Sequence, residues 1–174
     1  MILKKFTQLR SIKSLQMIKQ NCIYLDANFL IAFFADKHPD KDSSKKLFFN
    51  LLKSNSILFI STLTLDETWY KIWEIPYRER KLKKEKWPNI KTFYPKIKVI
   101  LDELKKLPET FKLIQFENSL DVGITNAAGN IGTHGLEPRD AFHLAYMQDQ
   151  QIETIITKDK KDFNNVPNIQ ILSY

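Results

Sequence analysis

The stretch that decides the fold is Asn21-Cys22-Ile23-Tyr24-Leu25, a short apolar run that Asp26 follows directly. A run of this length is typical of a buried strand. Similar runs occupy residues 57–60, 111–116, 154–157 and 169–172, and longer stretches with helical spacing of apolar residues lie between them. Because strands that alternate with helices form βαβ units, the sequence predicts a three-layer α/β/α domain with a mostly parallel central sheet.

Composition excludes several classes of protein. The chain has 174 residues, 43% hydrophobic and 27% charged, which suits one globular domain rather than a disordered chain. Lys and Arg outnumber Asp and Glu by 27 to 20, and the net charge of +7 favours acidic partners such as nucleic acid. The lone Cys22 excludes a disulfide framework and suits a reducing cytoplasm. No run approaches the ~20 apolar residues of a membrane helix, so we expect no membrane partner.

We expect a single domain over residues 21–174, preceded by a basic N-terminal extension over residues 1–20. The extension carries five basic residues and no acidic one, and it fits a surface helix, a transit peptide or an accessory RNA contact. Residues 75–110 form a basic insertion that contains aromatic residues, and we expect it to be helical. All four glycines fall between residues 123 and 135, so we expect the chain to turn there.

Acidic residues stand where the predicted strands and helices meet. Asp26 follows the first strand, Glu67 and Asp140 lie in the first turns of helices, and Asp159 follows the strand near residue 155. In parallel sheets, sites form beyond the carboxyl ends of the strands, so we expect these four acids to converge. Clustered carboxylates raise each other's pKa unless a cation lies between them, and oxygen ligands favour Mg²⁺ or Mn²⁺. Such an ion activates water for attack on a phosphoryl group.

Each of these acids also has a purely structural explanation. Thr64-Leu65-Asp66-Glu67 matches a capping box in which Glu67 reaches back to the start of its helix. Asp140 would complement the dipole of its helix, Asp26 would cap the helix that follows it, and Asp159 would be a turn residue. Their joint occurrence at successive element ends favours a shared site.

Four blocks of the sequence resemble the motif blocks of PIN-domain nucleases, and they occur in the order of that family. The blocks are YLDANFLIA at 24–32, STLTLDE at 61–67, RDAFHLA at 139–145 and ITKDKKDF at 156–163. The resemblance is strongest to small single-domain PIN proteins, including the VapC-type toxins of toxin–antitoxin pairs. It implies a metal-dependent ribonuclease that uses Mg²⁺ or Mn²⁺, a cognate antitoxin and a homodimer.

The resemblance also implies which acids are catalytic and which hold the metal. Carried over to this chain, it makes Asp26 and Asp140 the principal metal ligands. Glu67 would complete the site, directly or through a bound water. Asp159 matches the fourth acidic position, and Asp162 is the alternative for it.

Supporting residues follow from the same comparison. Asn28 and Thr157 match polar residues that support the site, and we expect Thr157 to hydrogen-bond a ligand carboxylate or the attacking water. We expect Arg139 to pair with Glu137 rather than to hold a phosphate. His143 lies one helical turn after Asp140, so it could face the site, but we expect it to be a core or rim histidine.

The segment from residue 78 to residue 98 is strongly basic. It contains nine basic and two acidic residues, so its net charge of +7 equals that of the whole chain. Phosphates attract such cations, and exposed rings stack with bases at about 1–3 kcal/mol each. The segment therefore fits an RNA-guiding arm, a solvated helical hairpin whose rings pack inward, or a docking surface for an antitoxin. The candidate RNA contacts are Arg78, Arg80, Lys81, Lys83, Lys84, Lys86, Trp87 and Lys91.

We therefore expect an endoribonuclease that hydrolyses RNA phosphodiester bonds with a metal-activated water, as the toxin of a toxin–antitoxin pair. Three alternatives stay open: an RNA-processing nuclease outside such a pair, a non-catalytic RNA-binding module on the same fold, and a phosphohydrolase of the haloacid-dehalogenase type. The last also begins with a strand that ends in Asp. It needs a second Asp two residues later, where this chain has Asn28.

Overall fold

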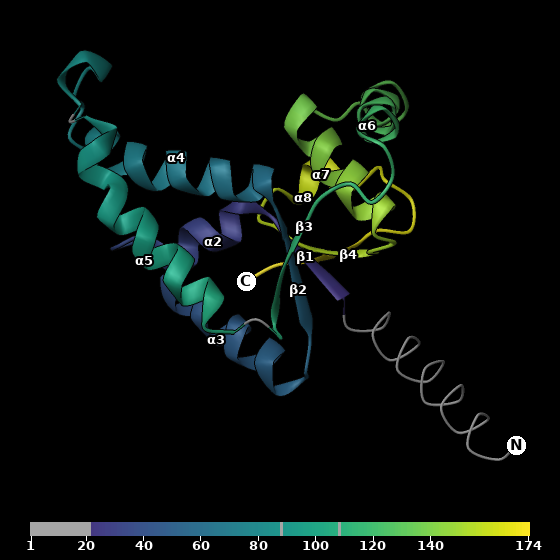
Figure 1. Ribbon diagram of the computed structural model, residues 1–174, viewed down its shortest axis with the longest axis horizontal. Coiled ribbons are helices and arrows are strands. Elements are labelled where there is room, and N and C mark those ends of the chain that lie inside the picture. The colour runs from purple at the N-terminus through teal and green to yellow at the C-terminus, as the bar shows by residue number, and fades with distance from the viewer. Residues whose placement is uncertain (1–21, 88, 108) are drawn as a thin grey trace, which may run out of the picture.

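A parallel sheet of five strands forms the centre of the molecule (Figure 1). The computed structural model describes residues 22–87, 89–107 and 109–174, so the expected extension over residues 1–20 lies outside the described residues. The strand order is β3-β2-β1-β4-β5, and all neighbouring pairs are parallel. The strands are β1 (Cys22–Leu25), β2 (Ile57–Ser61), β3 (Phe111–Ile114), β4 (Thr154–Ile156) and β5 (Gln170–Leu172).

Helices cover both faces of this sheet, which confirms the predicted three-layer α/β/α fold (Figure 1). One layer contains α2 (Ala27–Phe34), α3 (Lys41–Lys53), α4 (Thr62–Glu79) and α5 (Tyr94–Lys105). The other contains α6 (Leu120–His134), α7 (Pro138–Asp149) and α8 (Lys160–Phe163). No helix in the described part of the chain is long and apolar enough to cross a membrane.

Side chains of the apolar run in β1 pack alternately into two hydrophobic clusters, one on each face of the sheet. Ile23 and Leu25 pack in the cluster beneath α2, α3, α4 and α5, whereas Tyr24 packs in the cluster beneath α7 and α8. Successive side chains of a strand point to opposite faces, and both faces of this sheet are covered by helices. A continuous apolar run is therefore what a central strand of this fold requires.

The start of α4 differs from the prediction. The helix begins at Thr62 rather than Thr64, and Ser61 is its N-cap. The Ser61 hydroxyl accepts a hydrogen bond from the Thr64 backbone N–H at 3.2 Å, and the Thr64 hydroxyl accepts one from the Ser61 backbone N–H at 3.4 Å. Ser61 and Thr64 thus form the capping box. The structural alternative for Glu67, in which it closes this box, is therefore wrong, and its carboxylate makes other contacts.

The turn expected across the glycine-rich region is also wrong. Gly123, Gly129 and Gly132 lie inside α6, and only after His134 does Gly135 end the helix with a φ of 69°. A Cβ atom at Gly123 would lie 2.6 Å from the ring of Phe116. This glycine therefore permits a close approach between α6 and the segment after β3 instead of a change of direction.

The insertion forms a helical arm. We call residues 75–107 the basic arm, of which all but residue 88 are described. Within it α4 continues through Pro76 to Glu79, and the short 3-10 helices η1 (Lys84–Lys86) and η2 (Ile90–Phe93) lead into α5. The ring of Trp87 packs against Trp73 at 5.1 Å and stacks on Tyr77 at 5.8 Å. In Figure 1 the arm begins at the end of α4 that lies far from the sheet, and α5 runs back from there, so that Ile100 and Leu104 are buried in the core.

Candidate active site

Asp26 lies at the carboxyl edge of the sheet, where β1 and β4 end side by side. Its backbone N–H donates to Ile156 O at 3.1 Å, which extends the strand pairing by one residue. The hydroxyl of Thr157 donates to Asp26 Oδ2 at 2.6 Å, and the amide of Asn28 donates to the same oxygen at 3.0 Å. Asp26 is the N-cap residue of α2, yet its side chain makes no capping hydrogen bond. The carboxylate is therefore oriented by polar neighbours of the site.

The surroundings of Asp26 oppose its negative charge. The residue is only 7% exposed, and burial is the main factor that raises the pKa of its carboxyl group. His143 and the Thr157 hydroxyl lower this pKa in part, while the nearby Glu67 raises it further. A cation bound beside Asp26 would offset this unfavourable charge, as expected of a metal ligand.

Glu67 reaches the same edge from α4. Its Oε2 lies 3.2 Å from His143 Nε2, and its Oε1 lies 3.3 Å from Arg139 Nε. The expectation that Arg139 pairs with Glu137 is therefore wrong. Arg139 instead joins α7 to α4, because the two helices meet over the ends of β1 and β2.

Asp140 approaches from the first turn of α7 and is half-buried. The pKa of its carboxyl group is raised to about 6, first by burial and then by repulsion from Asp162, Asp26 and Glu137, while His143 opposes the rise. Interaction with the helix dipole alone would lower this pKa. The direction of the shift therefore shows that burial, together with repulsion from the other acids, outweighs the helix dipole at Asp140.

Asp159 is the N-cap residue of α8 and Asp162 lies within that helix, and both are exposed. The amide of Asn28 donates to Asp159 Oδ2 at 2.5 Å, so Asn28 bridges Asp159 and Asp26. The pKa of Asp162 is raised, chiefly by desolvation and then by repulsion from Asp159. Asp159 is thus linked to Asp26 through the Asn28 amide, whereas Asp162 acts on Asp140 through charge repulsion.

These acids share one cavity of about 200 Å³. Its lining contains acids from α4, from the start of α7, from the residue after β1 and from α8 and its N-cap, together with two basic residues. The charged and amide residues are Asp26, Glu67, Glu137, Asp140, Asp159, Asp162, Asn28, Lys71 and Arg139. The structure therefore brings together all the acids that the sequence singled out.

His143 lies in the site, a position that the sequence allowed but that we did not expect. It is buried, as expected of a core histidine, but its Nε2 also lies 3.9 Å from Asp26 Oδ1 besides its contact with Glu67. One ligand atom each from Asp26, Glu67 and His143 lies within 4.8 Å of the others. This oxygen and nitrogen donor set fits a divalent cation. The signal in the sequence was the spacing of three from Asp140, which places both side chains on one face of α7.

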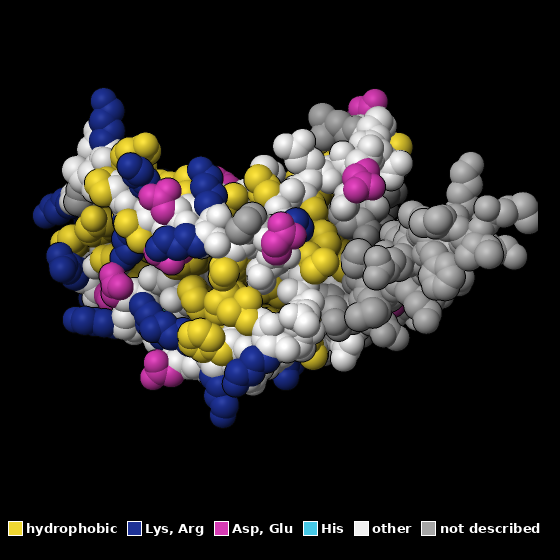
Figure 2. Space-filling model, turned by 60° about the horizontal axis from the view of Figure 1, so that its bottom comes forward, with side chains coloured by type: hydrophobic (Ala, Val, Ile, Leu, Met, Phe, Trp, Pro, Cys, Tyr) yellow, Lys and Arg dark blue, Asp and Glu magenta, His cyan; other side chains and the backbone are white. Residues whose placement is uncertain are grey.

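The basic arm begins at a distance from this cavity. Lys71 of α4 lines the cavity, and Arg78 lies seven residues further along the same helix, or roughly 10 Å at about 1.5 Å per residue. Arg78, Arg80, Lys81, Lys83, Lys84, Lys86 and Lys91 are all exposed. Figure 2 shows Lys and Arg side chains gathered at the left end of the molecule, where the arm lies. The indole of Trp87 donates to Leu82 O at 3.1 Å, so this ring is engaged within the arm.

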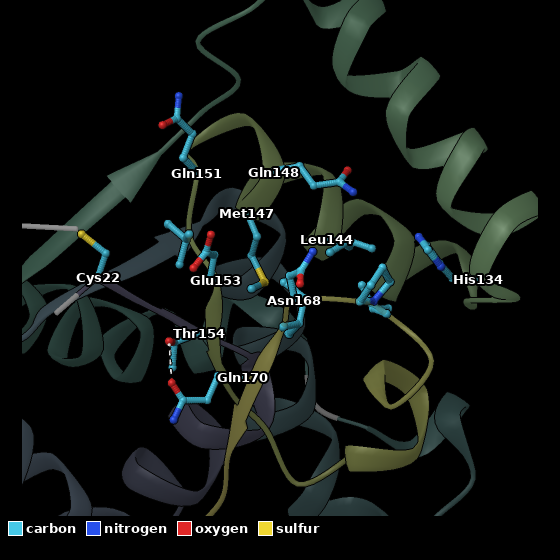
Figure 3. A pocket seen from close by; sticks show the side chains of 14 residues that line it. Cys22, His134, Leu144, Met147, Gln148, Gln151, Glu153, Thr154, Asn168 and Gln170 are labelled. Atoms are coloured by element: carbon cyan, nitrogen blue, oxygen red, sulfur yellow. Dashed lines mark hydrogen bonds between the residues drawn. The ribbon is translucent and has the colours of Figure 1, made fainter. Parts of the chain in front are cut away.

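A second cavity of about 670 Å³ lies at the opposite edge of the sheet, where β1, β4 and β5 begin (Figure 3). Amide side chains such as Gln148 and Asn168 line it together with the apolar Leu144 and Met147. Among the described residues that line it, Glu153 is the single carboxylate. This cavity therefore lacks the acidic cluster that the first one provides.

Solved structures that share this fold include toxin and toxin–antitoxin proteins. VapBC2 from Rickettsia felis, bound to a DNA fragment from its promoter, superposes with a TM-score of 0.56 and 19% identity over 88% of this chain and 98% of that one. A toxin–antitoxin complex from Klebsiella pneumoniae superposes with a TM-score of 0.55 and 19% identity, over 86% of this chain and 95% of that one. VapC20 from Mycobacterium tuberculosis is a toxin that cleaves the sarcin–ricin loop. It superposes with a TM-score of 0.56 and 16% identity, over 83% of this chain and 95% of that one.

Sequence comparison identifies the family. No curated protein sequence matches the chain. The family model of the PIN domain matches residues 23–169, which include all four sequence blocks and every acid of the cavity. The chain belongs to the PIN-domain family of nucleases.

Proposed function

We propose that this chain is a divalent-metal-dependent endoribonuclease that hydrolyses RNA phosphodiester bonds. The observation that carries the proposal is the convergence of Asp26, Glu67 and Asp140 on one cavity, although they lie 41 and 73 positions apart in the sequence. Burial and neighbouring acids raise the pKa of Asp26 and of Asp140, so charged carboxylates at these positions are costly to the fold. Such an arrangement is expected at functional sites, where a ligand compensates the cost.

The residues of the cavity divide the chemistry between them. Asp26, Glu67 and Asp140 would hold Mg²⁺ or Mn²⁺, which supplies polarisation of a phosphoryl oxygen and activation of water. The hydroxyl of Thr157 and the amide of Asn28 hold the Asp26 carboxylate in one orientation. The remaining acids, Asp159 or Asp162, stand at the exposed rim, where either one can accept a proton from the attacking water.

The test of this function is metal-dependent cleavage of RNA. We expect the purified chain to cleave structured RNAs such as tRNA and rRNA fragments with Mg²⁺ or Mn²⁺, and to lose this activity in EDTA. Asp26→Asn keeps the size of the side chain but removes its charge, so cleavage should fall at least 100-fold while the circular dichroism spectrum is unchanged. Asp66→Asn is the matched control, because Asp66 is exposed next to Glu67 on α4. Normal cleavage by the Asp26 variant would refute the site, and RNA binding in EDTA without any turnover by the wild type would indicate a binding module.

We propose that the basic arm guides RNA to the cavity. Its exposed cations lie on the extension of the helix that carries Glu67 and Lys71. A double change of Lys83 and Lys84 to Ser should weaken RNA binding and reduce the salt dependence of log K by about 1.4, at ~0.7 per phosphate contact. The same change at the exposed pair Lys45 and Lys46 of α3 is the control. If log K depends equally on salt concentration in the two variants, the arm does not bind the RNA phosphates.

We propose that the chain is the toxin of a toxin–antitoxin pair. The similarity to the Klebsiella pneumoniae complex and to VapC20 supports this proposal, and the arm exposes Leu82, Ile90, Tyr94 and Val99 among its cations. An acidic partner segment with apolar side chains would fit such a surface. Expression of the chain alone should stop bacterial growth, and co-expression of a small protein encoded beside it should restore growth. We also expect a homodimer by size-exclusion chromatography with light scattering. Normal growth with an active nuclease would favour an RNA-processing role.

A further inference from the structure

His143 stands in the candidate metal site, although its block of sequence suggested only Asp140 as a ligand. Its side chain is 2% exposed, and its Nε2 is 3.2 Å from Glu67 Oε2 and 3.9 Å from Asp26 Oδ1. Ligands that occupy adjacent positions around an ion at about 2.1–2.2 Å are roughly 3 Å apart. The nitrogen is therefore close enough to both carboxylates to share one ion with them.

The opposite side of the imidazole is held by a buried hydroxyl network. Tyr24 OH lies 2.7 Å from His143 Nδ1, 2.7 Å from Ser61 Oγ and 3.1 Å from Thr64 Oγ1, and Tyr24 is fully buried. A tyrosine hydroxyl has one proton to donate and also accepts hydrogen bonds. When Ser61 or Thr64 accepts the proton of Tyr24, the tyrosine oxygen accepts Nδ1–H of His143, and Nε2 presents its lone pair to Asp26 and Glu67. Histidines that bind metals usually have their other ring nitrogen fixed in this way.

We propose that His143 Nε2 is a ligand of the divalent ion together with the carboxylates of Asp26 and Glu67, and that it shifts the preference of the site from Mg²⁺ towards Mn²⁺. Mg²⁺ is bound almost entirely by oxygen ligands, whereas first-row transition ions, of which Mn²⁺ is the weakest binder, also accept imidazole nitrogen. This inference rests on the proposed metal-dependent function. The reverse tautomer, in which Nε2–H donates to Glu67, is the competing arrangement and leaves the nitrogen outside the ligand sphere.

The test uses Mn²⁺ as the probe and the full chain freed of metal. Pulsed electron paramagnetic resonance of bound Mn²⁺ detects nitrogen that is directly bonded to the ion. We expect a ¹⁴N coupling in the wild type that changes to a ¹⁵N pattern when histidine alone is labelled with ¹⁵N. The labelling needs no variant, so the result does not depend on whether a change at this buried position folds. The chain has three histidines, and His134→Gln, at the other cavity, should keep the coupling.

Metal affinities give the second measurement. We expect the wild type and His134→Gln to bind Mn²⁺ at least 10-fold more tightly than Mg²⁺ in competition titrations. His143→Gln should lose the nitrogen coupling, bind Mn²⁺ at least 10-fold more weakly and change little towards Mg²⁺. A Mn²⁺ ion whose binding depends on Asp26 but shows no nitrogen coupling would overturn the role of His143 alone. If Mn²⁺ does not bind, or if Asp26→Asn leaves its affinity unchanged, the proposed metal site fails as well.

Discussion

Neutralising Asp140 should make the metal-free protein more stable. The pKa of this carboxyl group is about 6, against an ordinary value of 3.8, so the folded protein holds the proton more tightly than the unfolded chain does. Its contribution to stability is therefore complete below about pH 4 and is lost as the pH rises from about 4 to 6. One pKa unit corresponds to 1.36 kcal/mol, so the whole difference would be about 3 kcal/mol at neutral pH. Since Asp140 is half-buried, solvent screening should reduce this to roughly 1 kcal/mol.

The assay is thermal unfolding of Asp140→Asn and of the wild type in EDTA. At pH 7.5 we expect the variant to have a Tm higher by about 2–4 °C, the change that ~1 kcal/mol gives in a chain of this length. The difference should shrink towards zero near pH 4, where the wild-type carboxyl group is protonated. With Mn²⁺ at 100 times its Kd, the wild type should gain about 2.7 kcal/mol, and the variant should gain much less.

Asp121→Asn is the matched control. Asp121 also lies in the first turn of a helix, but it is exposed on α6 and interacts favourably with the dipole of that helix. Its neutralisation should leave the Tm unchanged or lower it slightly at pH 7.5. The reasoning is refuted if Asp140→Asn behaves like this control in EDTA, or if Mn²⁺ stabilises Asp140→Asn as much as the wild type.

Three further outcomes follow from contacts in the structure. Thr157→Val removes the hydrogen bond to Asp26 Oδ2 and should lower metal affinity or cleavage rate about 10–100-fold, measured by Mn²⁺ titration and kcat; an unchanged rate would mean that Asp26 needs no such support. Gly123→Ala places a Cβ 2.6 Å from the Phe116 ring and should cost about 1–3 kcal/mol in urea unfolding, and an unshifted midpoint would contradict the close packing. Lys96→Ala removes an exposed ion pair with the loop after α2 and should cost less than ~1 kcal/mol; a loss of several kcal/mol would show that the arm is anchored there.

Much of the fold is readable from local patterns. The apolar run before Asp26 predicts a central strand because a strand covered on both faces has no polar side. Pro138 starts α7, as its position in the sequence suggests, and Ser119, one of two adjacent residues of capping type, caps α6. The start of α4 could not be chosen in this way, because Ser61 and Thr64 both belong to residue types that cap helices. The structure selects Ser61 since β2 extends up to that residue.

The sequence by itself determined that acids end the strands and begin the helices of a parallel α/β domain, because apolar periodicity and helix-start signals depend only on residues near each other in the chain. Only the tertiary structure decided that His143 contacts Glu67 and that Arg139 pairs with Glu67 rather than with its neighbour Glu137. Those contacts depend on how α4 and α7 pack across the edge of the sheet, and that packing is the sum of many weak contacts over both cores, which no short stretch of sequence encodes.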